Sequence, residues 1–367
     1  MKRKARAHCV VTVCAVFLLI GLAPTGVFKT EGFAAEQKVF HWKFSSHTSS
    51  GNKSLAPWQF WWREQVEKRS NGRIKVKIYW TDELCGPKEM MIAVKSRLAD
   101  VVGHTPSYTP GETPISNATY LPFLPPPRLD QAVMTYNRAF VELKPFVDEL
   151  KKFNCVYGGA YESGSYNLMG KKPVRNVNDL KGLRIRCMPD LGEVLKQFGA
   201  IPMTTPVTEM YSALDTGIVD VVAHSRVAWN AYKVDEISNY VTLDMDMGYA
   251  PTLHFINQDT MNELPDDLKK VVQSVIDDSP AFMWDLWYEP SRMAKADKVI
   301  KDRAMVITRF PKAERDKLVA KAELVWEAWA KRTGNYENAK QALADYIRIR
   351  DEVVAKYPQG VPGIVYK

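Results

Sequence analysis

The first part of the chain alternates between two hydrophobic periodicities. Residues 39–45 and 73–79 carry apolar side chains at every second position, which predicts half-buried strands. Between them, Trp58, Trp62 and Val66 recur at four-residue steps, which predicts an amphipathic helix. A strand–helix–strand order of this kind is typical of an α/β domain with a largely parallel sheet.

A second α/β run follows an irregular, proline-rich stretch at residues 105–127. Strands are predicted at 155–161, 183–188 and 219–223, and the C-terminal third is mostly helical. Because cores tend to split beyond about 250 to 300 residues, a chain of 367 residues is expected to form two lobes. We expect a cleft between the lobes, since ligands of open α/β sheets gather at the carboxyl ends of strands. No internal repeat is recognisable in the sequence.

The N-terminal segment, residues 1–35, has the layout of a secretory signal peptide. Basic residues precede an apolar stretch at 9–23, and the small residues Ala34 and Ala35 follow before Glu36. A membrane anchor is the alternative interpretation, but the apolar stretch is shorter than the roughly 20 residues that cross a bilayer. We therefore expect cleavage near residue 35 and export.

The formal net charge of +8 would by itself suggest a nucleic-acid partner. Residues 1–35 hold five basic residues and one acidic residue, so their removal lowers the charge by four, to +4. So small a charge gives little reason to expect a polyanion, and we expect no nucleic acid as partner. Three cysteines, Cys85, Cys155 and Cys187, remain after cleavage. Their odd number predicts that at least one is free or pairs between molecules.

Enzyme signatures are missing from the sequence. It contains no G-x-S-x-G elbow, no G-x-x-x-x-G-K-[ST] phosphate loop and no G-x-G-x-x-G fingerprint. Its histidines show no metal-ligand spacing. We therefore predict no catalytic residue, no metal and no cofactor. An exported α/β enzyme stays open as an alternative, because catalytic groups need not be close in sequence.

Residues 179–189 carry the most specific chemical signal. Strand alternation places Arg184 and Arg186 on one face, and Arg186 lies toward the carboxyl end of the strand, at the predicted cleft. A guanidinium is permanently charged, and its planar fork matches a carboxylate or a sulfonate. Arg186 is thus a candidate anion anchor, and an arginine on a solvated strand face is the alternative.

Two motifs identify a family that the chain resembles. They are D-L-K-G-L-R-I-R, which starts at Asp179, and the run G-A-x-P…P-x-x-E-x-Y-x-x-L-x-x-G-x-V-D at 199–220. In both, the chain resembles the solute-binding proteins of tripartite ATP-independent periplasmic (TRAP) transporters, the DctP-type or C4-dicarboxylate-binding family. The resemblance covers essentially all of the chain after residue 35. Arg97 stands where the family usually has glycine, which affects a local turn and not the fold.

The resemblance implies a two-lobed periplasmic binding protein of a Gram-negative bacterium, with a hinge and a long C-terminal helix across both lobes. Residues 36–160 would start lobe 1, 161–250 would form lobe 2, and 251–367 would complete lobe 1 and supply the spanning helices. Such a protein closes on a small organic acid anion and passes it to the small and large TRAP membrane subunits. We expect a monomer. A binding protein for another transporter class or for a sensor has the same fold and is a second alternative.

The resemblance also assigns site residues. The arginine that matches Arg186 forms the main salt bridge to the ligand's carboxylate in this family. The other predicted ligand-binding residues are Tyr166, Val207, His224 and Trp229 from the second lobe, and His47, Thr105 and Tyr108 from the first.

Two of these assignments depart from the family pattern, and two carry alternatives. Tyr166 stands about where relatives often have a second arginine, and His224 replaces a common asparagine. One arginine with tyrosine and histidine partners predicts a ligand with a single strong anionic group and an apolar, aromatic or hydroxyl-bearing body. Arg226 or a protonated His224 would add a second charge and weaken this interpretation. Trp229, at helical spacing, would alternatively belong to the core.

Overall fold

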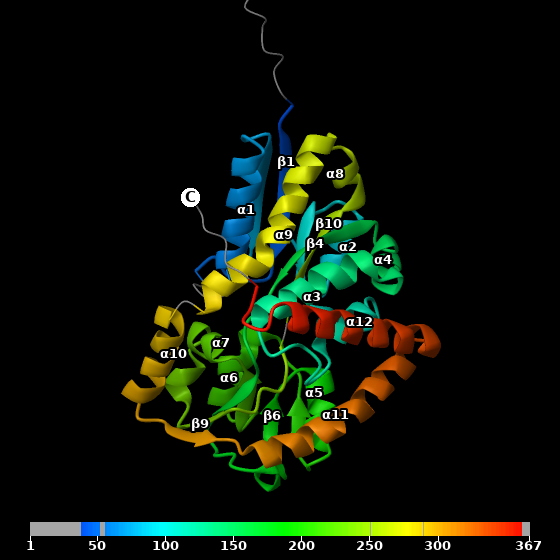
Figure 1. The fold of residues 1–367 in the computed structure, drawn as a ribbon. Helices are drawn as coiled ribbons and strands as arrows, with labels where there is room; N and C mark the ends of the chain where they lie inside the picture. The colour runs from blue at the N-terminus through cyan, green and yellow to red at the C-terminus, as the bar shows by residue number, and fades with distance from the viewer. Residues whose placement is uncertain (1–37, 52–55, 250, 289, 362–367) are drawn as a thin grey trace, which may run out of the picture. The chain divides into compact units, whose positions relative to one another are not determined.

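The computed structural model describes residues 38–51, 56–249, 251–288 and 290–361 (Figure 1). The predicted signal peptide at 1–35 lies outside these residues. Within the described part of the chain, no helix combines the length and the apolarity needed to span a bilayer.

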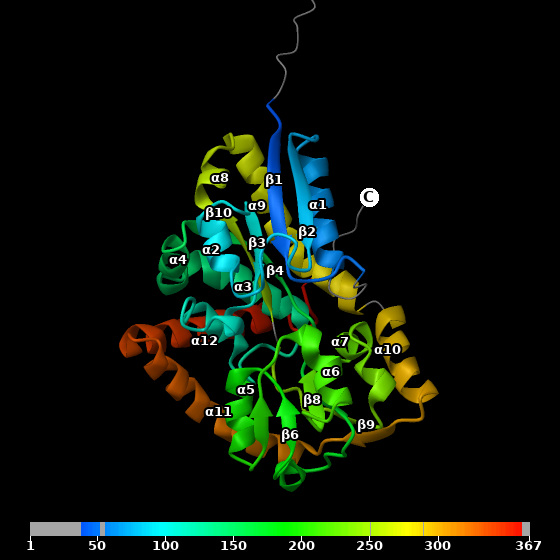
Figure 2. The same cartoon turned by 180° about the vertical axis from the view of Figure 1, so that it is seen from behind.

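The first sheet forms the core of one lobe. Its strands are β1 (Phe40–Ser46), β2 (Ile74–Trp80), β3 (Val101–His104), β4 (Cys155–Tyr161) and β10 (Thr252–Asn257), in the order β2-β1-β3-β10-β4. β1 pairs in parallel with β2 and β3, whereas β10 runs antiparallel to both β3 and β4. The helices of this lobe are α1 (Pro57–Arg69), α2 (Met90–Lys95), α3 (Leu129–Glu142), α4 (Lys144–Lys151), α8 (Gln258–Asn262) and α9 (Asp266–Tyr288) (Figures 1 and 2).

The second sheet forms the other lobe. Its strands are β5 (Asn167–Gly170), β6 (Arg184–Arg186), β7 (Ile201–Met203), β8 (Val221–His224), β9 (Tyr240–Leu243) and β11 (Val306–Arg309), in the order β11-β9-β5-β8-β6-β7. Its helices are α5 (Pro189–Lys196), α6 (Met210–Asp215), α7 (Arg226–Ala231), α10 (Pro290–Asp302) and α11 (Lys312–Arg332). The 3-10 turns are η1 (Pro106–Tyr108), η2 (Ser116–Tyr120), η3 (Val177–Leu180), η4 (Val207–Glu209) and η5 (Val234–Ile237).

The expected two-lobed α/β architecture is confirmed, with two refinements. β11 belongs to the second sheet, so segment 251–367 also completes the second lobe, which the predicted boundaries did not include. The C-terminal crossing is divided among successive helices. α9 packs on α1 and α3, α10 on α7, and α11 on α5, and α12 (Tyr336–Lys356) returns to α3 and α4. Gly334, with φ 77°, makes the turn between α11 and α12.

The core consists of separate apolar clusters around the two sheets. Trp58 and Trp62 of α1 are fully buried in the cluster of the first sheet, and their rings stack at 6.3 Å between centroids. α1 begins at Pro57, whose missing N–H costs nothing at a helix start. It ends before Asn71 and Gly72, which both have positive φ. The four-residue spacing of the tryptophans thus marks the buried face of the predicted helix.

The two lobes use the same turn before an inner strand. Segments 90–104 and 210–224 each run from a short helix, α2 or α6, through a residue of positive φ into β3 or β8. That residue is Arg97 (φ 57°) in the first lobe and Gly217 (φ 73°) in the second. The repeat is local and was not recognised in the sequence, although both segments contain Asp-Val-Val-x-His, at 100–104 and 220–224.

An aspartate fixes each of these turns. Asp100 accepts a hydrogen bond at 2.8 Å from the backbone N–H of Lys43 on β1. Asp220 accepts one at 3.0 Å from the backbone N–H of Arg184 on β6. Each aspartate also donates its own N–H to the carbonyl of the same neighbour. The carboxylates therefore tie the start of an inner strand to the strand beside it.

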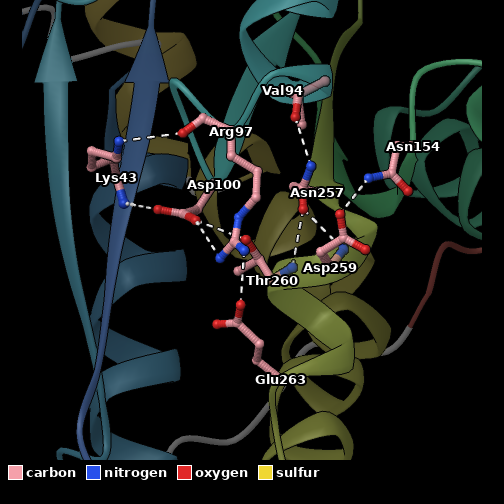
Figure 3. A network of polar contacts seen from close by, with 9 residues as sticks. All are labelled: Lys43, Val94, Arg97, Asp100, Asn154, Asn257, Asp259, Thr260 and Glu263. Atoms are coloured by element: carbon pink, nitrogen blue, oxygen red, sulfur yellow. Dashed lines mark hydrogen bonds and ion pairs between the residues drawn. The ribbon is translucent and has the colours of Figure 1, made fainter.

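Arg97 keeps the turn that a glycine usually makes in the resembled family. Its guanidinium pairs with Glu263 at 2.7 Å, and its carbonyl accepts a hydrogen bond from Lys43 Nζ at 3.3 Å (Figure 3). Asp100 is held in turn by the hydroxyl of Thr260 at 2.7 Å. These contacts offset the cost of left-handed backbone at a residue with a side chain.

Candidate ligand-binding site

A cavity of about 30 Å³ lies between the two lobes. Its lining residues are His47, Thr105, Tyr108, Tyr120, Tyr161, Ser163, Tyr166, Arg186, Met188, Val207, His224, Tyr232 and Thr252. His47 follows β1 and Thr105 follows β3, whereas Arg186 and His224 end the neighbouring strands β6 and β8. Ends of parallel strands from both sheets therefore meet here. Such a volume has room for about one or two water molecules.

Seven of the eight predicted site residues line this cavity, and Trp229 does not. Trp229 lies in α7, is fully buried, and packs in an apolar cluster with Met210 and Val234. The assignment of Trp229 to the cleft is wrong, because the inward face of α7 covers the second sheet instead of the cavity. The core alternative applies to this tryptophan.

Several lining residues were missed by sequence reasoning. Tyr161 ends a strand that was predicted, so its position at a strand end was an available signal. Thr252 starts β10 directly opposite Tyr161. Only the antiparallel insertion of β10 brings Thr252 to this edge, and nothing local in the sequence indicates that pairing. Ser163 lies on the connection from β4 to β5, outside any predicted element.

Arg186 is buried in the cavity wall with part of its guanidinium unsatisfied. Its side chain is 1% exposed, and Nε and Nη2 donate to the carbonyl oxygen of Thr205 at 3.2 and 2.6 Å. Nη1 is buried without a hydrogen-bond partner, and no carboxylate of the described residues lies within ion-pair distance of Arg186. A buried charge is costly unless it is paired. With the Nε–Nη2 edge occupied, the edge formed by Nη1 and Nη2 remains for an anion.

Arg184, two residues earlier on the same strand, has a different environment. It forms an ion pair with Asp220 at 2.9 Å, and Lys172 pairs with the same carboxylate at 2.9 Å. The hydrogen bond from Arg184 holds the pKa of Asp220 well below its usual range. Arg184 is therefore part of the structural turn, and Arg186 is the arginine that faces the cavity.

Arg226 supplies no second charge to the cavity. It forms an ion pair with Asp297 on α10 at 2.6 Å, and it is not among the lining residues. Among the described lining residues, Arg186 is the one permanently charged side chain. The cavity thus combines a single cation with aromatic and hydroxyl-bearing walls.

His224 lies beside this charge as a neutral ring. Burial, and then the nearby charge of Arg186, place the pKa of His224 well below its ordinary value. The backbone N–H of Ser225 donates to Nδ1 of His224 at 2.8 Å, which leaves the ring proton on Nε2. The ring packs on that of Tyr166, with 4.6 Å between centroids. Burial raises the pKa of Tyr166, so its phenol stays neutral as well.

His47 and Tyr108 form the first-lobe side of the cavity. Nδ1 of His47 lies 3.2 Å from the carbonyl oxygen of Gly103, and because a carbonyl only accepts, Nδ1 carries the proton. Burial lowers the pKa of His47. The hydroxyl of Tyr108 accepts a hydrogen bond from the backbone N–H of Val207 at 3.4 Å. This contact joins the lobes at the cavity rim.

Comparison with known proteins identifies the family. A sequence model described as bacterial extracellular solute-binding protein, family 7 (DctP), matches residues 47–333. The chain belongs to this family of TRAP solute-binding proteins.

Individual relatives agree with this assignment. The 2,3-diketo-L-gulonate-binding periplasmic protein YiaO of Escherichia coli K12 is 26% identical over 69% of this chain and 75% of its own length. A TRAP solute-binding protein from Rhodoferax ferrireducens T118, solved with copurified benzoate, is 21% identical with a TM-score of 0.77 over 87% of this chain and 99% of that chain. A marine metagenome TRAP protein, solved with 3-hydroxybenzoate, is 23% identical with a TM-score of 0.74 over the same shares. At these identities the structural likeness shows the fold.

Family membership decides between the alternatives left by the sequence. The protein is a solute-binding protein and not an enzyme, so the exported-enzyme interpretation is excluded. TRAP solute-binding proteins are periplasmic, bind small molecules and work with TRAP membrane permeases. The family and fold expected from the two sequence motifs are confirmed.

Proposed function

We propose that the protein captures a small organic acid with one anionic group, a carboxylate or a sulfonate, and that Arg186 is its anion anchor. The observation that carries the proposal is the buried Nη1 of Arg186, which lacks a partner among the described residues and lies at a cavity between two lobes. Closure around an anion would satisfy this nitrogen and remove the ligand from water. Charge-assisted hydrogen bonds of this kind contribute about 1.5–3 kcal/mol, or about 10- to 150-fold in affinity.

The character of the ligand follows from the other walls. Both histidines at the cavity are neutral, so the site carries a single positive charge, which suits a monoanion. Five tyrosines among the lining residues suit an aromatic or hydroxyl-bearing body. Two similar proteins were solved with benzoate and 3-hydroxybenzoate, which are aromatic monocarboxylates, and this supports the same class here.

Delivery follows from lobe movement. The connections from β4 to β5 and from β9 to β10 are the proposed hinge, close to the predicted boundaries at 160 and 250. We propose that the mature protein, without residues 1–35, acts as a monomer that hands its ligand to the small and large permease subunits. Its proposed location is the periplasm.

A binding screen tests the proposal. Thermal unfolding is measured with a library of monocarboxylates, dicarboxylates and sulfonates, and mass spectrometry identifies any acid that copurifies. The best acid should raise the unfolding temperature of the parent protein and of Arg184→Gln, the matched control on the same strand. Arg186→Gln should lose most of that increase, with an affinity lower by about 10- to 150-fold. Equal affinity of Arg186→Gln and the parent would remove Arg186 as the anchor.

A further inference from the structure

Two neutral histidines line the cavity, and they carry the ring proton on different nitrogens: His224 on Nε2 and His47 on Nδ1. The backbone fixes each arrangement, since the N–H of Ser225 donates to Nδ1 of His224 and the carbonyl of Gly103 accepts from Nδ1 of His47. His224 therefore offers an Nε2–H donor, and His47 offers an Nε2 lone pair. In the described part of the chain, no hydrogen-bond partner is found for Nε2 of either ring.

The two rings belong to opposite lobes. His224 ends β8, the neighbour of β6, so that it and Arg186 lie at adjacent strand ends of the second sheet. His47 follows β1 of the first sheet. A ligand that bridges the lobes would thus meet two donor groups at one end and an acceptor at the other.

We infer that His47 and His224 select the ligand by where it carries hydrogen-bond acceptors and donors. His224 donates to the anionic group beside Arg186, and His47 accepts from a hydroxyl or N–H group at the other end of the ligand. The ligand is then a monoanionic acid that carries a hydrogen-bond donor distal to its carboxylate or sulfonate. This inference rests on the proposed function and narrows its substrate class.

A third polar group of the cavity wall lacks a hydrogen-bond partner. Ser163 lines the same cavity, is 4% exposed, and its Oγ has no hydrogen-bond partner among the described residues. Unsatisfied buried hydroxyls are rare in folded proteins, because each costs free energy. A hydroxyl or N–H group of the ligand would give Ser163 a partner.

The same geometry disfavours two other ligand classes. A dicarboxylate would bring a second negative charge toward the His47 lone pair, and no second cation lines the described part of the cavity. An ether or a plain hydrocarbon end would leave Nε2 of His47 buried and unpaired after closure. Both classes should therefore bind more weakly than the matching hydroxy acid.

The test uses matched acids that differ at one group. Three series are measured by calorimetry: the meta-hydroxy, meta-methoxy and meta-carboxy derivatives of benzoate, the same derivatives of phenylacetate, and glycolate, methoxyacetate and malonate. In any series that binds, the hydroxy member should exceed both others by at least about fivefold. If no series binds, the inference is tested on the acid that copurifies with the protein. That acid should be a monoanion with an O–H or N–H group.

Two variants of His47 separate recognition from folding. His47→Phe should abolish the preference for the hydroxy member while still binding unsubstituted benzoate or phenylacetate, and His47→Arg should shift the preference to the dicarboxylate. His224→Asn, which keeps an N–H donor, should retain binding, whereas His224→Phe should weaken every acid alike.

Several outcomes would overturn the inference while leaving the proposed function intact. These are tightest binding of a dicarboxylate by the parent, equal binding of hydroxy and methoxy acids, or an unchanged preference in His47→Phe that still unfolds at the parent temperature. A copurified acid without any donor would do the same. Failure of every acid to bind, with no effect of Arg186→Gln, would instead contradict the proposed function.

Discussion

Arg186 combines a cost to the fold with a proposed role in binding. Its guanidinium is buried beside the neutral rings of His224 and Tyr166, and its hydrogen bonds go to one carbonyl, that of Thr205. Desolvation of an unpaired charge costs several kcal/mol even after the protein relaxes. The surrounding fold must offset this cost until an anion is bound.

This balance predicts opposite effects of one substitution. Arg186→Met keeps much of the side-chain volume and removes the buried charge, so the ligand-free protein should become more stable by about 1 kcal/mol or more, a rise of about 2 °C or more in unfolding temperature. The same variant should show no stabilisation by the acid that binds the parent. Calorimetric melts with and without that acid measure both effects. A less stable ligand-free variant would show that the charge is already compensated.

The neutral histidines predict a flat pH profile of binding. His224 faces the charge of Arg186 and the ring of Tyr166, and burial together with that charge keeps its pKa low. His47 faces Tyr108, and burial lowers its pKa although the charge of Asp82 opposes the shift. Because both pKa values lie below the ordinary value of 6.5, neither ring should take up a proton between about pH 7.5 and pH 6.5, a range in which the buried Glu162, with a pKa of about 8, stays mostly protonated. Titration calorimetry should give a constant affinity in this range. An affinity that rises as the pH falls would mean that a histidine becomes charged on binding.

At the scale of the elements, the turns before β3 and β8 have the same left-handed backbone conformation, although different residues form them. Gly217 has φ 73° and open space where a side chain would begin. Arg97 has φ 57° and depends on its ion pair with Glu263 and on Lys43. The second lobe thus uses the residue suited to left-handed backbone, whereas the first lobe compensates with contacts.

Two substitutions of Arg97 separate backbone cost from side-chain contacts. Arg97→Ala and Arg97→Gly both lose the ion pair with Glu263, but glycine also relieves the positive φ. Arg97→Gly should therefore be more stable than Arg97→Ala by about 1 kcal/mol. Denaturant titration of the two variants provides the measurement. Equal stability would mean that the turn changes its conformation once the arginine is gone.

Local patterning predicted elements whose own sequence alternates between buried and exposed positions. Strands β1 and β2 and helix α1 were predicted from alternation and four-residue spacing, because each buries one face. β10 and β11 were not placed, since their partners β4 and β9 lie far away in the chain. Pairing over such distances depends on the whole fold and leaves no periodic signal.

The candidate site divides in a similar way. Arg186 was singled out because it lies toward the carboxyl end of a predicted strand, whereas His224, which ends β8, was assigned by the family resemblance. Trp229 was misplaced because helical spacing does not tell which face of α7 is turned inward. Ser163 and Thr252 reach the cavity through the crossing connection and the antiparallel strand, which sequence reasoning did not supply.

At the scale of the molecule, a buried carboxyl group lies where the chain crosses between the lobes. Glu162 follows β4, is fully buried, and its Oε1 accepts a hydrogen bond from the hydroxyl of Tyr136 on α3 at 2.5 Å. Its Oε2 has no partner among the described residues. Burial raises the pKa of Glu162 to about 8, so the group is protonated in the folded protein at neutral pH. Glu162 directly precedes Ser163 of the cavity wall.

The raised pKa predicts how stability changes with pH. In the unfolded chain Glu162 has its ordinary pKa of 4.5, whereas in the folded protein the pKa is about 8. Below pH 4.5 both states hold the proton and the contribution to stability is fully present. As the pH rises from there through about 8, the unfolded chain releases the proton first, and the free energy of unfolding falls. Glu162→Gln keeps the size of the side chain and cannot ionise, so this decline should be absent.

Denaturant titration of both proteins from about pH 5 to pH 9 tests this prediction. The variant and the parent should be similar at the acidic end, and the variant should be the more stable one at the alkaline end, by a margin that grows with pH. Glu209→Gln, at an exposed position of the second lobe, serves as the control and should follow the parent. Parallel curves for Glu162→Gln and the parent would mean that the buried carboxyl does not hold its proton. In that case Glu162 would carry a negative charge near the cavity. This charge would offset that of Arg186, on which the proposed monoanion selectivity depends.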